Sequence, residues 1–265
     1  MTYEGVLTKM QTEFSNPIQY YLVFENSFLS LNQLLDKSLE INFVGYQCLN
    51  CGKKKKIFRQ GFCYDCFMSS AAAGDWIMKP ELSTAHLDIE DRDLNYEKKV
   101  QLQPHIVYLA LSSEVKVGVT RNTQVPTRWI DQGAVKAIKL AKTPNRHLAG
   151  LIEVSLKEYF ADKTNWRKML TSNFEEADII KNKKIALDEL GSEFEEFFKT
   201  DSEVMKFNYQ IDKSIDSVKS VSLKKSDDIE GKLIGIKGQY LIFEDSSVFN
   251  VRSNEGYVVD ISIFD

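Results

Sequence analysis

The sequence predicts an α+β protein with a small metal-binding module in its N-terminal part. Residues 1–46 and 204–265 contain short segments rich in β-branched and aromatic residues, separated by Gly, Asn, Asp and Ser, as in antiparallel strands and their turns. Residues 105–170 alternate apolar, strand-like segments with segments of helical periodicity. Between these regions, all four cysteines lie in two closely spaced pairs.

The composition is typical of a soluble globular protein, with 43% hydrophobic residues. The chain has no apolar run of about 18 residues, and its N-terminal segment lacks the charged and apolar regions of a secretion signal. We therefore expect a cytoplasmic protein with no membrane partner. The net charge of −4 argues against a protein that coats nucleic acid indiscriminately, because such binding requires many Lys and Arg residues to neutralise phosphates.

Charge is nevertheless uneven along the chain. Residues 115–150 carry seven basic side chains against the single acid Asp131, a net charge of +6. Residues 171–203 are mainly acidic. A basic core beside an acidic segment is consistent with a confined site for a polyanion, and a solvated surface is the simpler alternative.

Residues 1–46 are predicted to form a small antiparallel β unit, and residues 47–76 a zinc ribbon. The ribbon prediction rests on two CxxC pairs separated by 11 residues, a spacing that directs four thiolates at one tetrahedral metal ion. Such a closed site has no open coordination position, so the zinc would be structural. A redox role is less favoured, because the region lacks a βαβ pattern. The predicted ligands are Cys48, Cys51, Cys63 and Cys66.

The lysines at positions 53–56, between the two cysteine pairs, allow two interpretations. They either contact phosphate or form the solvated tip of a hairpin. Residues 77–104 have weak periodicity and many charges, which predicts an irregular connection over the surface.

Residues 105–170 are predicted to form a core of order β-β-α-β-α. Two apolar strands, HIVYLAL and VKVGVT, flank a tight turn at residues 112–114. Pro126 begins a short helix that ends at Gly133, a third strand follows, and a longer amphipathic helix carries Glu153 at the edge of its apolar face.

The remaining residues are predicted to form a helical linker over 171–203, interrupted at Gly191, and a C-terminal β unit over 204–265. The C-terminal unit is expected to be a small barrel or a curled sheet. Packing of this unit against the N-terminal β unit would bring the two termini together.

The core resembles the GIY-YIG nuclease superfamily, in particular a phage-like branch whose second element reads KIGxT. In that resemblance, Ile106-Val107-Tyr108 occupies the first element, Lys116-Val117-Gly118 the second, Arg128 the helix arginine and Glu153 the metal-binding glutamate. Together with the ribbon and the segments KVGVTR, PTRWIDQGA and DKTNWRKML, nearly the whole chain resembles a prokaryotic family known as domain of unknown function 2797.

The resemblance implies a role for each core residue. Tyr108 would orient or deprotonate the attacking water, Arg128 would stabilise the phosphate, and Glu153 would bind magnesium or manganese. Lys116 stands where the superfamily has a second tyrosine. A lysine can neutralise phosphate, and it becomes a useful base only when desolvation lowers its pKa. Taken singly, each of the four has a simpler structural explanation as a core aromatic, a surface ion pair or a solvated carboxylate.

Two functions follow from these expectations. The first is a zinc-containing protein that binds DNA or RNA at a GIY-YIG-like phosphate site and cleaves it with a divalent metal. The second is a catalytically inactive scaffold that uses the same core to bind nucleic acid or a protein partner.

Overall fold

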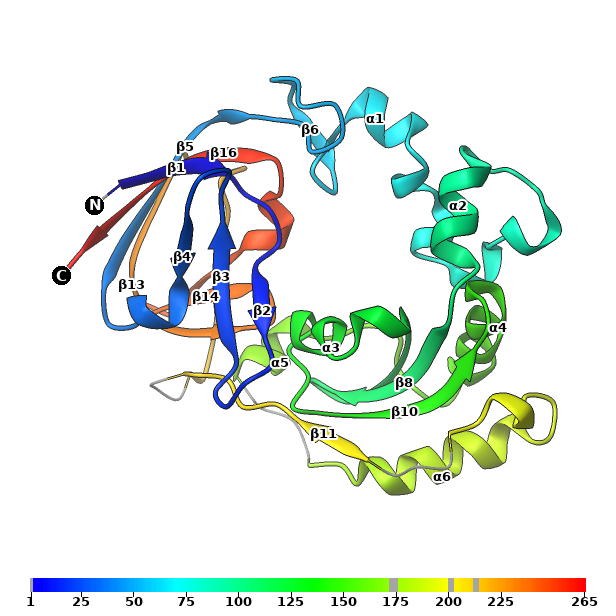
Figure 1. Ribbon diagram of the computed structural model, residues 1–265. Helices are drawn as coiled ribbons and strands as arrows, with labels where there is room; N and C mark the ends of the chain where they lie inside the picture. Colours follow the sequence, from blue (N-terminus) through cyan, green and yellow to red (C-terminus); the bar gives the residue numbers. More distant parts are fainter. Residues whose placement is uncertain (1, 172–175, 200–202, 212–214) are drawn as a thin grey trace. The chain divides into compact units, whose positions relative to one another are not determined.

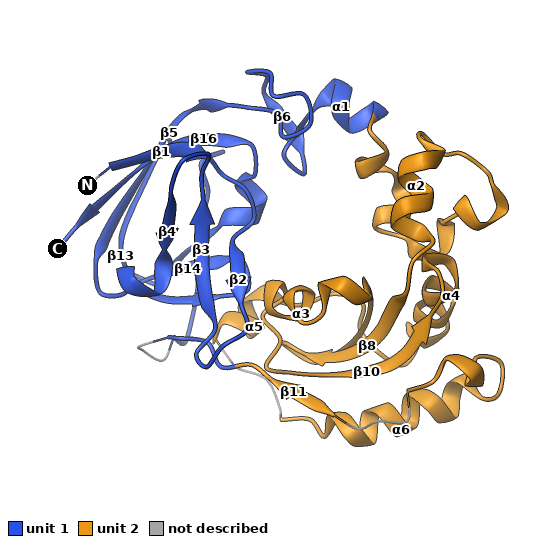
Figure 2. Cartoon of the chain, viewed as in Figure 1, with its two compact units in different colours: residues 1–69, 208–265 blue, residues 70–207 orange. Residues whose placement is uncertain are grey.

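The computed structural model describes residues 2–171, 176–199, 203–211 and 215–265 (Figure 1). The chain divides into two compact units, which we describe separately: unit 1 comprises residues 1–69 and 208–265, and unit 2 comprises residues 70–207 (Figure 2). Strands and helices occur together, which confirms the α+β class. None of the helices in the described ranges combines the length and apolar character needed to cross a bilayer.

Unit 1 is built on a seven-stranded sheet that combines strands from both ends of the chain. All neighbours in this sheet are antiparallel except the parallel pair β12 and β15. The sheet is open at β1 and β12, so among the described residues the barrel that we considered from the sequence does not form. In sheet order the strands are β1 (Thr2–Val6), β16 (Tyr257–Phe264), β5 (Ser38–Tyr46), β13 (Asp228–Lys237), β14 (Tyr240–Phe243), β15 (Ser247–Asn250) and β12 (Lys219–Val221).

Parts of the chain from both ends meet in this sheet because strands β5 and β16 share a buried face. Leu39 and Ile41 of β5 alternate with more exposed residues, and Ile261 of β16 lies directly opposite Ile41. All three side chains are buried. Since side chains alternate between the two faces of a strand, this register places the apolar sets of β5 and β16 on one face. At the edge, β1 pairs with β16 from Thr2 opposite Ser262 onward.

Two smaller substructures complete unit 1. A three-stranded sheet contains β2 (Gln11–Glu13), β3 (Gln19–Val23) and β4 (Phe28–Ser30). The cysteine-bearing segment forms the hairpin β6 (Ile57–Arg59) and β7 (Phe62–Cys63), followed directly by helix α1 (Tyr64–Ser69).

Unit 2 contains a four-stranded sheet in the order β11-β10-β8-β9. The first hairpin turns at residues 112–114, as predicted, and the order β8, β9, α3, β10, α4 is that predicted for the core. The strands are β8 (His105–Leu111), β9 (Val115–Arg121), β10 (Lys136–Thr143) and β11 (Val204–Lys206). The helices are α2 (Leu94–Gln101), α3 (Thr127–Asp131), α4 (Arg146–Leu156), α5 (Trp166–Thr171) and α6 (Ile179–Leu190).

The two faces of the unit 2 sheet differ in chemistry. Val107, Leu109 and Val117 belong to the apolar core that also contains residues of α4 and α6. The register of β8 and β9 pairs Tyr108 with Gly118 and Ala110 with Lys116, so Tyr108 and Lys116 point to the opposite face. The sheet thus has one face for packing and one that carries polar groups.

One segment is more ordered than the sequence predicts. Where an irregular connection is expected over residues 77–104, the structure has short 3-10 turns and helix α2, with Glu97 and Gln101 buried. Glu97 accepts hydrogen bonds from three successive backbone N–H groups, at residues 91–93, which explains how a charged residue can be buried there.

In the predicted linker, α6 ends at Gly191 with φ +59°. Residues 172–175 and 200–202 of that linker lie outside the described residues.

Gly150 of α4 sets the distance between this helix and the 3-10 turn Pro80–Leu82. A Cβ atom at position 150 would lie 2.2 Å from the backbone nitrogen of Glu81 and 2.5 Å from the carbonyl carbon of Pro80. We expect Gly150→Ala to destabilise the protein by about 1–3 kcal/mol, because backbone must move and the higher helix propensity of Ala offsets only about 1 kcal/mol. Urea unfolding measures this change. Gly45→Ala is the control, since a Cβ there meets nothing within 4 Å, and equal stability loss in both variants would contradict the expectation.

Candidate functional site

The four cysteines converge in unit 1. Their sulfur atoms all lie within 4.8 Å of one another, and Cys48, Cys63 and Cys66 are buried while Cys51 is exposed. The first pair sits on a turn in which Gly52 donates its N–H to the carbonyl oxygen of Cys48, with φ +67° at Gly52. The second pair spans the end of β7 and the start of α1. These four residues are positioned to hold a metal ion.

The chemistry around the sulfurs fits a divalent cation. Cys48 Sγ accepts the backbone N–H of Cys63 at 3.3 Å. Burial opposes ionisation of Cys48, but backbone hydrogen bonds to its sulfur outweigh the effect of burial and lower the pKa of Cys48 to about 6. At Cys66, a side-chain hydrogen bond from Asn50 favours the thiolate, but burial and the three neighbouring thiols prevail and raise its pKa to about 12. Because the neighbouring sulfurs oppose ionisation of Cys66, all four cysteines can be thiolates together only with a cation between them, as in a closed structural site.

In unit 2, Tyr108 and Lys116 lie close together on the polar face of the sheet. The Tyr108 ring crosses Gly118, where a Cβ atom would lie 2.7 Å from its hydroxyl oxygen. That hydroxyl donates to Gln132 Oε1 at 2.9 Å. Burial raises the pKa of Tyr108, against the effect of the neighbouring Arg128. The glycine of the KVGVT segment is thus explained by the tyrosine that covers it.

Lys116 is almost completely buried, with 4% of its surface exposed. Its ammonium nitrogen donates to Thr164 Oγ1 at 2.8 Å. Burial and the positive charge of Arg128 lower its pKa to about 7, although Glu153 and Asp162 act in the opposite direction. The lysine that replaces the expected tyrosine is therefore desolvated, which is the condition under which a lysine can act as a base.

Arg128 and Glu153 complete the predicted set, and both are partly buried. Arg128 influences the pKa values of Tyr108 and Lys116, and so does Glu153. Burial raises the pKa of Glu153, with opposing effects from Lys157, whose Nζ lies 3.9 Å from Glu153 Oε2. Arg128 and Glu153 therefore lie near enough to Tyr108 and Lys116 to affect their ionisation.

Two residues near Glu153 were not singled out from the sequence. Arg146, the first residue of α4, donates to the carbonyl oxygens of Trp76 at 3.1 Å and Ile77 at 2.8 Å. Burial lowers its pKa to about 10, while Glu153 opposes the shift. Glu81 raises the pKa of Glu153, and the Oε2 atom of Glu81 is buried without a hydrogen-bond partner.

A signal for Arg146 exists in the sequence. A basic residue in the first helical turn is disfavoured by the helix dipole, so an arginine there indicates a specific partner. Glu81 offers no comparable signal, because it lies in a segment without clear periodicity.

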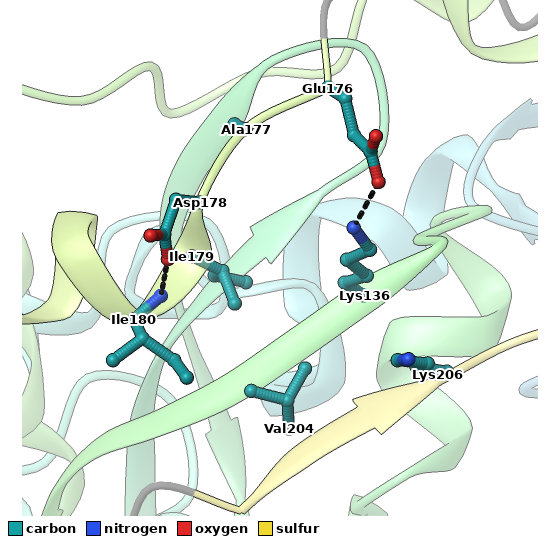
Figure 3. Close-up of a pocket in the computed structure, with 8 residues that line it drawn as sticks. All are labelled: Lys136, Glu176, Ala177, Asp178, Ile179, Ile180, Val204 and Lys206. Carbon is teal, nitrogen blue, oxygen red and sulfur yellow. Dashed lines mark hydrogen bonds and ion pairs between the residues drawn. The ribbon is translucent and has the colours of Figure 1, made fainter.

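A separate cavity of about 530 Å³ lies beside the start of α6 in unit 2 (Figure 3). Lys136 and Glu176 form an ion pair of 2.6 Å at its wall, and Asp178 accepts the backbone N–H of Ile180. Tyr108, Lys116, Arg128 and Glu153 are not among its lining residues. This cavity is therefore not the predicted site.

Comparison with known proteins gives a family match. The model of a family described as "Protein of unknown function (DUF2797)" matches residues 36–259, which covers both the cysteine cluster and the core residues. Searches of curated proteins and of solved structures found no match.

Proposed function

The chain belongs to the DUF2797 family, whose description assigns no activity, and we propose its function from its own residues. The protein is a zinc-containing nucleic-acid-binding protein whose GIY-YIG-like core cleaves phosphodiester bonds with the help of a divalent metal ion. DNA and RNA are both substrates of the right chemistry. The observation that carries the proposal is Lys116, a buried lysine with a pKa of about 7 beside Arg128 and Glu153.

This setting supports a division of labour among the core residues. Neutral Lys116 accepts a proton from the attacking water, since near pH 7 much of the lysine is unprotonated. Tyr108 is a poorer base, because burial raises its pKa, and its hydroxyl orients the water instead. Arg128 provides the fixed positive charge that stabilises the phosphorane.

The acidic residues support a cation site at Glu153. Glu81 and Glu153 are two carboxylates in one neighbourhood, and Glu81 Oε2 is a buried oxygen in need of a partner. Oxygen donors of this type suit magnesium or manganese. When bound there, the ion would add positive charge near the scissile phosphate.

The cysteine cluster supports zinc as the structural metal of unit 1. Four thiolates match the ligand preference of zinc, and the closed set has no position for water or substrate. The zinc would therefore stabilise the ribbon and take no part in cleavage.

A catalytically inactive scaffold is the second candidate, and the burial of Tyr108 favours it. With 1% of its surface exposed and its hydroxyl bonded to Gln132, Tyr108 also fits a purely structural role. In that case the same basic core binds nucleic acid, or a protein partner, without cutting.

The pH dependence of cleavage tests the role of Lys116. If neutral Lys116 is the base, the rate rises with pH and levels off above about pH 7, and Lys116→Met lowers it at least about 100-fold. If Lys116 acts through its positive charge, the rate instead falls as pH rises through the same range, and Lys116→Arg retains activity. Initial rates on an end-labelled oligonucleotide with magnesium distinguish the two. A falling profile with active Lys116→Arg would contradict the assigned role.

A further inference from the structure

Unit 1 contains a groove beside the zinc ribbon that no part of the proposed nuclease site uses. Its volume is about 680 Å³, within the range of about 300–1,000 Å³ that is usual for small-molecule sites. One wall is the ribbon hairpin, and the other is the end of the β5 and β16 pair. Five aromatic rings line it: Phe43, Tyr46, Phe58, Tyr64 and Tyr257.

A β-bulge creates the sheet wall of this groove. Gly45 lies opposite Val258 and Phe43 opposite Val259, so β5 has one extra residue, Val44. The extra residue turns Phe43 and Tyr46 to the same face, where their ring centroids are 4.8 Å apart. Tyr257 joins them at 5.6 Å from Phe43 and 5.0 Å from Tyr46.

The ribbon wall carries aromatic rings that remain exposed. Phe58 and Tyr64 meet edge to face at 5.2 Å, with 44% and 59% of their surfaces exposed. The hairpin is held against the sheet at Gly256, where a Cβ atom would lie 2.7 Å from Ile57 Cδ1. Large exposed aromatic side chains on a well-supported wall are typical of a binding surface.

The charges at this groove are mainly positive. Among the described residues that line it, Lys56 and Lys224 are exposed bases and Asp227 is the single acid. Lys55, by contrast, pairs with Asp65 at 2.6 Å. Within the lysine run between the cysteine pairs, Lys56 is thus the residue that lines the groove.

We propose that this groove binds single-stranded nucleic acid, with bases stacked on the exposed rings of Phe58 and Tyr64 and phosphates beside Lys56 and Lys224. Flat rings accept any base, whereas bases in a duplex are stacked on each other and cannot reach such rings. The two lysines supply the matching charge for the backbone. The volume suits roughly one or two bases. The groove goes beyond the proposed cleavage site, because it belongs wholly to unit 1 while Tyr108, Lys116, Arg128 and Glu153 belong to unit 2.

The test is fluorescence anisotropy of a labelled 12-nucleotide oligothymidine with the full-length, zinc-loaded protein, without added divalent metal or chelator. The double variant Phe58→Ala with Tyr64→Ala should bind at least about tenfold more weakly. Lys56→Ala with Lys224→Ala should reduce the slope of log affinity against log salt by about 1.4. Zinc content equal to that of the wild type shows that the ribbon remains folded in each variant.

Matched controls come from the same unit. Phe28→Ala removes a ring that is 62% exposed outside the groove, and Lys219→Ala removes an exposed lysine outside it. Both should bind as the wild type does. In an Arg128→Ala background, which disables the proposed nuclease site, the aromatic double variant should lose the same factor in oligonucleotide affinity. The groove can therefore be tested even if the proposed nuclease site is wrong. The proposal would be overturned if the groove variants and the controls bound the oligonucleotide with equal affinity. It would also be overturned if the wild type bound no oligonucleotide at all, and a peptide would then be the occupant.

Discussion

Replacing Glu153 with Gln should lower magnesium-dependent cleavage of nucleic acid by about a thousandfold. The side chain keeps its shape but loses the negative charge that holds the cation. A bound metal ion lowers the activation free energy of such reactions by several kcal/mol, and each 1.4 kcal/mol changes the rate about tenfold. Binding of the uncut substrate should change little, because Arg128 and Lys116 remain. Cleavage rates and substrate affinity, measured on the same preparation, check both expectations.

The Glu153→Gln variant should also be at least as stable as the wild type. Burial raises the pKa of Glu153, so the ionised carboxylate costs folding free energy at pH values above its ordinary pKa, and the neutral amide avoids that cost. Glu158→Gln is the matched control, since Glu158 is an exposed glutamate that follows the same helix. Equal loss of cleavage in both variants, or full activity in Glu153→Gln, would contradict the assignment.

Replacing Cys63 with Ser should abolish metal binding and unfold the ribbon. Cys63 is buried, and a structural zinc site of this kind contributes about 10–16 kcal/mol to folding in isolated zinc-finger peptides. Elemental analysis should show zinc falling from about one equivalent per chain to well below about 0.2. The hairpin β6 and β7 should then lose protection against hydrogen exchange.

Lys54→Ser provides the control for the cysteine variant. Lys54 is exposed in the loop between the two pairs, so its replacement should leave zinc content unchanged. A wild-type protein without zinc, or a Cys63→Ser variant that keeps a full equivalent, would show that the four cysteines are not a zinc site.

Much of this structure follows from short-range patterns in the sequence. The metal-ligand geometry depends on a local turn and on a strand-to-helix junction close to it in the sequence, so the spacing of the cysteine pairs was sufficient to predict that the thiols converge. The β8 and β9 hairpin and helix α4 follow from strand-like composition and helical periodicity over fewer than about 18 residues. Local patterns therefore located the cysteine site, whereas the four core residues were assigned through the family resemblance.

Contacts between distant segments could not be predicted in this way. Arg146 bonds to backbone that lies 69 and 70 residues earlier, and the backbone of Glu81 lies against α4 where Gly150 permits close packing. Similarly, the aromatic groove depends on one extra residue in β5 and on a pairing of strands from opposite ends of the chain. No periodicity records such contacts, since they are set by tertiary packing.

The central claim is that the core around Lys116 and Glu153 cleaves nucleic acid. The most direct measurement incubates zinc-loaded wild-type protein with end-labelled single-stranded DNA, duplex DNA and RNA, with magnesium or manganese, and resolves the products on a denaturing gel. We predict discrete cleavage products from at least one substrate, dependent on the added metal and absent with Glu153→Gln. Intact substrate in every wild-type lane, or products that persist with Glu153→Gln, would contradict the account.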